Sequence, residues 1–263
     1  MTATAGLTIT RDGSVATLTL DRPELLNRFD EAMHHDFIAA VNQVAGENEI
    51  RAVVLASTGK VFSAGGDFEM MRHAHDNPDV RRRLAADARR LLTSLIELPQ
   101  PIVAAVQGAA VGLGATVVLS CDAVVASRNA KIADSHVNVG LVAGDGGAVV
   151  WPAIAGVLRA KRHLLTGDPL DAETAFTLGL VTDLVDEPDQ VLPAATVLAT
   201  RIAGLPPLAV QLTKRAINRG LLQRAGEVLE LSLAYEETTL ASDDLLEGIE
   251  ALQERRPGDF TGR

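Results

Sequence analysis

The chain has 263 residues, a length that fits one or two domains and buries enough apolar surface to fold without a disulfide or a metal. Apolar residues make up 47% of it but aromatic residues only 3%, so we expect a core of valine, leucine, isoleucine and alanine. The formal charge of −10, from 24 basic and 34 acidic residues, argues against a nucleic-acid partner. The single cysteine, Cys121, excludes an internal disulfide and a four-cysteine zinc site, and it fits a reducing compartment.

Targeting and membrane signals are not evident in the sequence. The N-terminal residues show no basic stretch followed by an apolar run, so we expect no signal peptide. The longest apolar run, Val103 to Leu119, contains glycines and Gln107 and is shorter than the roughly 20 residues that span a bilayer. We therefore predict a cytoplasmic protein with no membrane partner. No spacing of ligand residues points to a metal site.

The first half of the chain alternates between strand and helix patterns. A hairpin is predicted around Asp12-Gly13, with arms at residues 7–10 and 15–20. The next elements are a helix from Asp30 to about Ala45, a strand at 53–56, a helix at 79–97, and strands at 102–106 and 124–125. Repeated strand–helix units indicate an α/β fold with a mainly parallel sheet covered by helices.

The second half becomes mostly helical after Asp171, which we expect to cap a helix. Residues 222–252 predict one or two long helices rich in leucine and glutamate. We divide the chain into a core domain over 1–198 and a C-terminal helical region over 199–263. The leucines of these helices need a surface to cover them: Leu229, Leu231, Leu233, Leu240, Leu245 and Leu246.

Two glycine-containing turns follow predicted buried strands. The first, Val61 to Asp67, has two glycines before an acid that can cap the next helix. The second, Gln107 to Thr116, opens an apolar helix. Such turns expose backbone N–H groups that suit a phosphate or a developing oxyanion, although tight strand-to-helix connections look the same. The dinucleotide fingerprint fails because Val117 occupies its third glycine position, so nucleotide binding is not expected.

Four ordered motifs resemble the enoyl-CoA hydratase/isomerase (crotonase) superfamily. They are Asp21 to Asn27, Val61 to Asp67, Ala105 to Asp122, and Leu164 to Val181, and the resemblance covers about Leu7 to Phe260. It implies a crotonase-type superhelix of ββα units, with C-terminal helices that assemble a homotrimer or homohexamer. It also implies an acyl-CoA thioester as substrate, as in fatty acid metabolism. Coenzyme A would then be part of the substrate, with no separate cofactor.

The resemblance also implies an oxyanion hole. By position, the backbone N–H groups of Ala64 and Leu113 would polarise the thioester carbonyl and hold the enolate. One such donor is often worth about 2.7–4 kcal/mol in the transition state. Leu113 stands where the family normally has glycine, so its side chain reshapes the pocket. The residues expected to cradle the bound acyl-CoA are Ala64, Gly65, Gly66, Asp67 and Gly112.

Both glutamates of the family hydratases are replaced in this chain. Thr116 stands at the first position and His136 at the second. A hydroxyl can orient water but cannot act as a general acid or base near neutral pH, which argues against hydration by the usual pair. An imidazole with a pKa of about 6.5 can exchange a proton at physiological pH. We therefore expect neutral His136 to be the base, with Asp145 holding its tautomer.

The stretch Val142 to Pro152 resembles one branch of the family in particular. That branch contains oxocamphor hydrolase, a β-diketone hydrolase that uses a His/Asp pair for retro-Claisen carbon–carbon cleavage. Glu236 falls where that enzyme has an active-site glutamate. The simpler interpretation makes His136 a hydrogen-bonded core histidine and Asp145 a helix cap.

Three function hypotheses follow from these residues. The leading one is a crotonase-family enzyme of the enoyl-CoA hydratase/isomerase type, with His136 and Asp145 replacing the glutamate pair. The alternatives are a hydrolase that cleaves carbon–carbon bonds of β-diketones or β-ketoacyl groups, and a non-catalytic acyl-CoA-binding protein. Among the other histidines, His34 is expected at the surface or hydrogen-bonded, whereas His73 and His75 are candidates for the acyl pocket, with solvated positions favoured.

Overall fold

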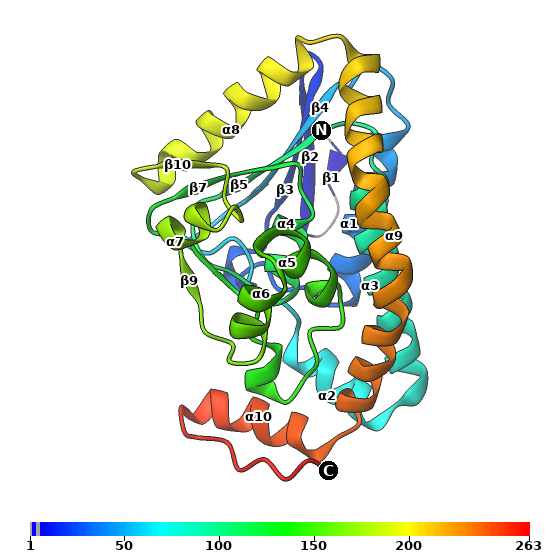
Figure 1. Cartoon of the computed structure of the whole chain (residues 1–263), viewed down its shortest axis with the longest axis vertical. Helices are drawn as coiled ribbons and strands as arrows, with labels where there is room; N and C mark the ends of the chain where they lie inside the picture. The colour runs from blue at the N-terminus through cyan, green and yellow to red at the C-terminus, as the bar shows by residue number, and fades with distance from the viewer. Residues whose placement is uncertain (1, 4–5) are drawn as a thin grey trace.

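The computed structural model describes residues 2–3 and 6–263, which fold into two sheets surrounded by helices (Figure 1). The larger sheet has seven strands in the order β1-β2-β3-β4-β5-β7-β10, and the smaller has three in the order β6-β8-β9. The strands are β1 (Thr2–Ala3), β2 (Leu7–Asp12), β3 (Val15–Leu20), β4 (Ala52–Ser57), β5 (Ile102–Val106), β6 (Ala110–Val111), β7 (Ala123–Ser127), β8 (Lys131–Ala133), β9 (Leu170–Asp171) and β10 (Asp183–Val185).

The larger sheet is mainly parallel, as the sequence predicts. The predicted hairpin is present, since β2 and β3 pair antiparallel from Leu7↔Leu20 to Asp12↔Val15. From β3 onward every pairing is parallel, through β4, β5 and β7 to β10. Parallel neighbours need a crossover connection, and for this reason helices separate these strands along the chain. The α/β class inferred from the alternating patterns is therefore confirmed.

Helices cover both faces of this sheet. The helical elements are η1 (Pro23–Leu25), α1 (Glu31–Ala45), α2 (Phe68–Asp76), α3 (Pro78–Glu97), α4 (Leu113–Leu119), η2 (His136–Val139), α5 (Gly147–Ala155), α6 (Val157–Leu164), α7 (Ala172–Thr177), α8 (Pro188–Ala203), α9 (Pro207–Leu240) and α10 (Asp243–Glu254). In Figure 1, α8 lies on one side of the sheet, and most of the other helices lie on the opposite side.

The strand β4 shows how the apolar core is divided. Val53 and Leu55 point into the main core, which includes buried residues of α1, α3, α4 and α5. Val54, which lies between them in sequence, points the other way, into a second cluster with Val191 and Ala195 of α8. Successive side chains of a strand face opposite sides, so a strand covered on both faces must be apolar throughout.

Aspartate side chains cap the N-termini of three helices. Asp30 accepts a hydrogen bond from the Met33 N–H at the start of α1. Asp67 does the same for α2, and Asp171 for α7. Each carboxylate satisfies an N–H group that has no partner within the helix, which typically contributes about 1 kcal/mol. The caps expected at Asp67 and Asp171 are confirmed.

The predicted helical stretch 222–252 consists of the end of α9 and most of α10. In Figure 1, α9 is the long orange helix, which packs against α3 and α5, while α10 packs against η2 and α2. Leu229, Leu233 and Leu245 are buried within this chain, so they need no second subunit to cover them. Leu231 is exposed. The expected boundary between residues 198 and 199 falls inside α8.

A helix that crosses a membrane must be both long enough and apolar enough. Within the described residues, no single helix meets both requirements. The pair α8 and α9 meets them only jointly, and it is bent by 109° at the break between the two helices.

Candidate active site

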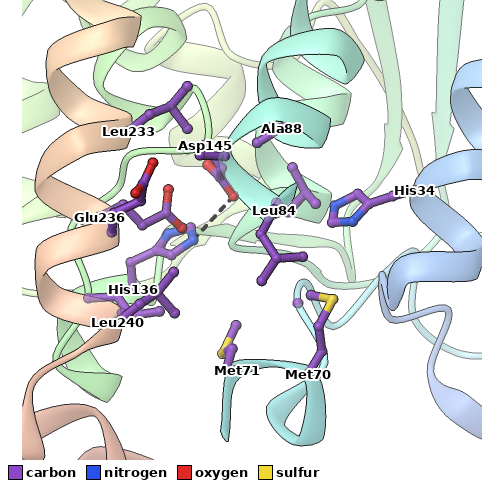
Figure 2. Close-up of a pocket in the computed structure, with 15 residues that line it drawn as sticks. His34, Met70, Met71, Leu84, Ala88, His136, Asp145, Leu233, Glu236 and Leu240 are labelled. Atoms are coloured by element: carbon purple, nitrogen blue, oxygen red, sulfur yellow. Dashed lines mark ion pairs between the residues drawn. The ribbon is translucent and has the colours of Figure 1, made fainter. Parts of the chain in front are cut away.

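A pocket lies between α1, α2, α3 and α9 (Figure 2). Its empty volume is about 530 Å³, including the part open to solvent. Apolar side chains form much of its wall, among them Met70, Met71, Leu84, Ala88, Leu233 and Leu240. Five titratable side chains also reach it: His34, His136, Asp145, Glu236 and Glu237. An apolar pocket with a few convergent polar groups is the usual form of a small-molecule site.

The two glycine turns meet beside this pocket. A Cβ atom on Gly65 would lie 2.7 Å from the Val111 carbonyl oxygen and 3.6 Å from the Gly112 Cα. Gly65 also has a φ of +89°, a conformation that side chains disfavour. Only glycine allows this approach, which brings together two segments that are distant in the sequence. Their meeting agrees with the expectation that both contribute to one site.

Leu113 keeps the position expected for an oxyanion-hole donor. It is the first residue of α4 and lines the pocket. Its N–H has no acceptor within the helix, because the first N–H groups of a helix lack partners one turn earlier. Such a donor, fixed at a helix start, suits a carbonyl oxygen that becomes negative.

Ala64 does not have the position expected for the second donor. Its N–H donates to the Leu26 carbonyl oxygen at 3.0 Å, and Ala64 does not line the pocket. The assignment of Ala64 was therefore wrong, because this part of the turn is tied to the chain after η1. Gly66 does line the pocket, and its N–H donates to no acceptor in the described part of the chain. Gly66 and Leu113 are thus two pocket-lining residues, one on each turn, whose backbone N–H groups are free to donate.

The other residues expected to cradle the acyl-CoA lie behind the pocket. Gly65 and Gly112 form the contact between the two turns and are not among its lining residues. The carboxylate of Asp67 is buried, caps α2 and pairs with Arg28, so it is occupied in holding the turn. Of the five expected residues, only Gly66 reaches the pocket, since packing, hydrogen bonds and an ion pair within the turns occupy the rest.

His136 lies between two carboxylates. Its Nε2 is 3.2 Å from Asp145 Oδ2, the ion pair drawn in Figure 2. Its Nδ1 is 2.7 Å from Asp134 Oδ1, a partner that the sequence analysis missed. The Asp-x-His spacing directly after β8 was the available signal. Thr116 is fully buried and donates its hydroxyl to Asp145 Oδ1 at 3.1 Å.

These contacts shift the pKa values of both His136 and Asp145. Burial alone lowers the pKa of His136, but the charges of Asp134 and Asp145 outweigh it and raise that pKa well above its ordinary value. Burial alone raises the pKa of Asp145, but the His136 charge and the hydrogen bonds from His136 and Thr116 outweigh it and lower that pKa. These shifts favour an imidazolium beside an Asp145 carboxylate over the neutral His136 base expected from the sequence.

Glu236 reaches the same pocket from α9. A Cβ atom on Gly144 would lie 2.5 Å from Glu236 Oε2, so the missing side chain at Gly144 makes room for the carboxyl group. Removal from bulk water raises the pKa of Glu236 to about 8, and the nearby Asp145 charge also raises it, against the effect of His136. At neutral pH, a pKa of about 8 favours the uncharged form of Glu236, and the lowered pKa of Asp145 favours its carboxylate.

Among the remaining histidines, His34 has surroundings that differ from those expected. His34 on α1 is only 4% exposed and lines the pocket, and neither ring nitrogen has a hydrogen-bond partner in the described chain. The expectation of a surface or hydrogen-bonded His34 was wrong. The signal was its helical spacing with the buried Phe37 and Val41. His73 and His75 on α2 are not lining residues of this pocket. Across residues 2–3 and 6–263, no group of three or more acidic, His or Cys side chains is arranged to hold a metal ion.

Comparison with known proteins identifies the family of this chain. The family described as enoyl-CoA hydratase/isomerase matches residues 10–263. A 1,2-epoxyphenylacetyl-CoA isomerase of Escherichia coli (strain K12) is 34% identical over 251 residues, 95% of each chain. A trans-2-decenoyl-[acyl-carrier-protein] isomerase of Streptococcus mutans is 30% identical over 254 residues, 96% of each chain.

Solved structures agree with this placement. The crystal structure of an enoyl-CoA hydratase/isomerase from Mycobacterium paratuberculosis has a TM-score of 0.90 and 34% identity, and the match covers 94% of this chain and 98% of that one. The sequence resemblance is thereby confirmed at the level of the superfamily. This chain belongs to the enoyl-CoA hydratase/isomerase family and is an enzyme of the type that acts on acyl-CoA thioesters.

Proposed function

We propose that this enzyme is an isomerase that shifts a carbon–carbon double bond within an acyl-CoA thioester through an enolate. The observation that carries the proposal is the pair of carboxyl groups on one pocket wall. Asp145 is ionised because His136 and Thr116 hold it, and Glu236 is uncharged because it is removed from water without a cation of its own. Two carboxyl groups with separated pKa values supply a proton acceptor and a proton donor at the same pH.

The first step is removal of a proton from the carbon next to the thioester carbonyl. Asp145 accepts this proton, and the electron pair moves onto the carbonyl oxygen. The N–H groups of Gly66 and Leu113 stabilise the negative oxygen, and such donors contribute most where charge develops. In a β,γ-unsaturated substrate, the resulting enolate is conjugated with the double bond.

The second step returns a proton to the far end of the conjugated system. Glu236 donates its proton there, the electron pair leaves the oxygen, and the double bond moves next to the carbonyl. Asp145 is then protonated and Glu236 ionised, and transfer of one proton from Asp145 to Glu236 restores the starting state. No water enters the product.

Two further points favour isomerisation over hydration. Thr116 is buried, donates to Asp145 and is not a lining residue of the pocket, so it is not positioned to orient a water molecule against the substrate. Hydration of a trans-enoyl thioester by a glutamate pair is also disfavoured, because this chain has a glutamate at neither of the two positions.

The test is to incubate the protein with a β,γ-unsaturated acyl-CoA in D₂O. We expect a product of unchanged composition apart from deuterium, with the ultraviolet absorbance of a conjugated thioester. Mass spectrometry separates this product from a hydrated one, which is heavier by one water. A hydrated product alone would contradict the proposal.

A second candidate is hydrolysis of a carbon–carbon bond. The specific observation in its favour is that His136, Asp145 and Glu236 line one pocket, the set implied by the resemblance to oxocamphor hydrolase. Incubation with a cyclic β-diketone and with a β-ketoacyl-CoA tests it, since cleavage adds one water and breaks the carbon chain. Binding of acyl-CoA without any product would instead indicate the non-catalytic acyl-CoA-binding protein.

A further inference from the structure

His34 occupies the side of the pocket opposite to the reacting groups. In Figure 2 its ring extends from α1 toward the pocket, whereas His136, Asp145 and Glu236 approach from the other side. Leu84, Met70 and Met71 lie between these two polar ends. The pocket is therefore polar at both ends and apolar in its middle.

The His34 ring has hydrogen-bonding capacity that the protein leaves unused. It packs against Phe29, with ring centroids 5.6 Å apart, and it is 4% exposed. Neither Nδ1 nor Nε2 has a partner among the described residues. A neutral imidazole carries one N–H donor and one acceptor nitrogen, and buried polar groups are nearly always hydrogen-bonded. A buried ring without partners at a pocket wall thus points to a ligand group that completes it.

The ring is uncharged when the enzyme works at neutral pH. Burial lowers the pKa of His34 to about 4, although the charges of Asp87 and Asp145 oppose this shift. An uncharged imidazole recognises a neutral polar group, such as a hydroxyl or a carbonyl. It does not provide the charge that would select a carboxylate.

We propose that His34 determines substrate specificity by hydrogen-bonding an oxygen atom that the acyl group carries away from its thioester. The substrate class is then an acyl-CoA with an apolar segment followed by a hydroxyl or keto group. This inference rests on the proposed function, because it takes the thioester to lie at Gly66 and Leu113. An acyl chain held there lies in the same pocket as Leu84, Met70 and His34.

The test uses acyl-CoA thioesters that cannot react. A series of saturated acyl-CoAs of increasing chain length is paired with the same series carrying a terminal hydroxyl. Dissociation constants are measured by calorimetry. At the chain length that reaches His34, we expect the hydroxyl to tighten binding to the wild-type protein by about five- to tenfold, the gain of one good hydrogen bond.

Two substitutions and a matched control connect this preference to the ring. His34→Leu removes the hydrogen-bonding groups and should abolish the preference for the hydroxyl, while His34→Gln, which keeps a donor and an acceptor, should retain part of it. His35→Leu, on the exposed neighbouring histidine, should bind both series as the wild type does. A purely structural role of His34 would weaken both series equally and leave their ratio unchanged.

The outcomes separate this inference from the proposed function. If wild-type protein binds both series equally at every length, or if His34→Leu keeps the preference, His34 is not a specificity residue although the acyl-CoA function stands. If neither series binds, the acyl-CoA site itself is wrong, and this inference is overturned with it.

Discussion

The Nε2 atom of His136 lies 3.2 Å from Oδ2 of Asp145, and both side chains are less than 10% exposed. Asp134 holds the other ring nitrogen, and the two carboxylates raise the pKa of His136, which favours the positively charged ring. In the proposed isomerase mechanism, Asp145, and not the imidazole, therefore accepts the proton.

The first prediction follows from that arrangement. Asp145→Asn removes the proton acceptor and should lower kcat by about 100-fold or more, the usual contribution of a general base. Thr116→Val removes only one hydrogen bond to Asp145 and should cost much less. Steady-state kinetics with a β,γ-unsaturated acyl-CoA measures both. A larger loss in Thr116→Val than in Asp145→Asn would mean that the roles are inverted.

His136→Ala should also lose most of the activity, for a different reason. Without the imidazolium, the buried Asp145 carboxylate loses its cation, and its pKa should rise. We therefore expect the activity of this variant to recover in part at higher pH, where Asp145 ionises again. A pH–rate profile of the variant with the same shape as that of the wild type would contradict this role.

The oxyanion hole can be tested at Leu113 without changing the helix. Proline is well tolerated at the first position of a helix, so Leu113→Pro removes the N–H and leaves α4 intact. We expect kcat/KM to fall by about 100- to 1,000-fold. Leu113→Ala keeps the N–H and serves as the matched control. Circular dichroism of both variants shows whether the fold is retained, and a folded, fully active Leu113→Pro would disprove the assignment.

The pKa of Glu236 predicts the alkaline limb of the pH profile. Its uncharged form, the proton donor, is present below about pH 8 and disappears above it, so kcat/KM should fall as pH rises through about 8. Glu236→Gln cannot donate a proton and should be slower by about 100-fold, without this limb. If activity instead rises through pH 8, Glu236 is the base.

The buried His34 predicts a loss of stability in acid. Its folded pKa of about 4 lies below its ordinary value of 6.5, so the unfolded chain binds the proton more readily. The associated stability is complete above pH 6.5 and is lost as pH falls toward 4, by up to about 3 kcal/mol. Urea unfolding at both pH values should show a smaller loss for His34→Leu than for the wild type. Equal losses would place the ring in contact with water.

Self-association remains a prediction for this chain. The first half of α9 leaves large apolar side chains exposed, including Leu208 at 73% and Ile217 at 71%. Burying such side chains between subunits removes them from water, at about 1.5–3 kcal/mol for each one fully covered. We expect light scattering to give the mass of a trimer or a hexamer of the 27.7 kDa chain. A stable monomer at micromolar concentration would exclude both.

The sequence by itself determined the elements and the superfamily. Alternating and helical spacings of apolar residues located most strands and helices, because burial of one face imposes those periods on the chain. The hairpin at Asp12-Gly13 and the caps at Asp67 and Asp171 also depend on residues close together in sequence. The pairing of His136 with Asp145 was inferred from a resemblance and is present in the fold.

Only the tertiary structure decided the chemistry of the site. The hydrogen bond from the Ala64 N–H to the Leu26 carbonyl oxygen leaves Gly66 as the free donor of this turn. Because Ala64 and Leu26 are far apart in the sequence, no local sequence pattern predicts that contact. The charge of His136, the raised pKa of Glu236 and the lowered pKa of His34 all depend on burial and on charges brought in from distant segments. Proton affinities respond to surroundings in space, whereas sequence patterns record neighbours along the chain.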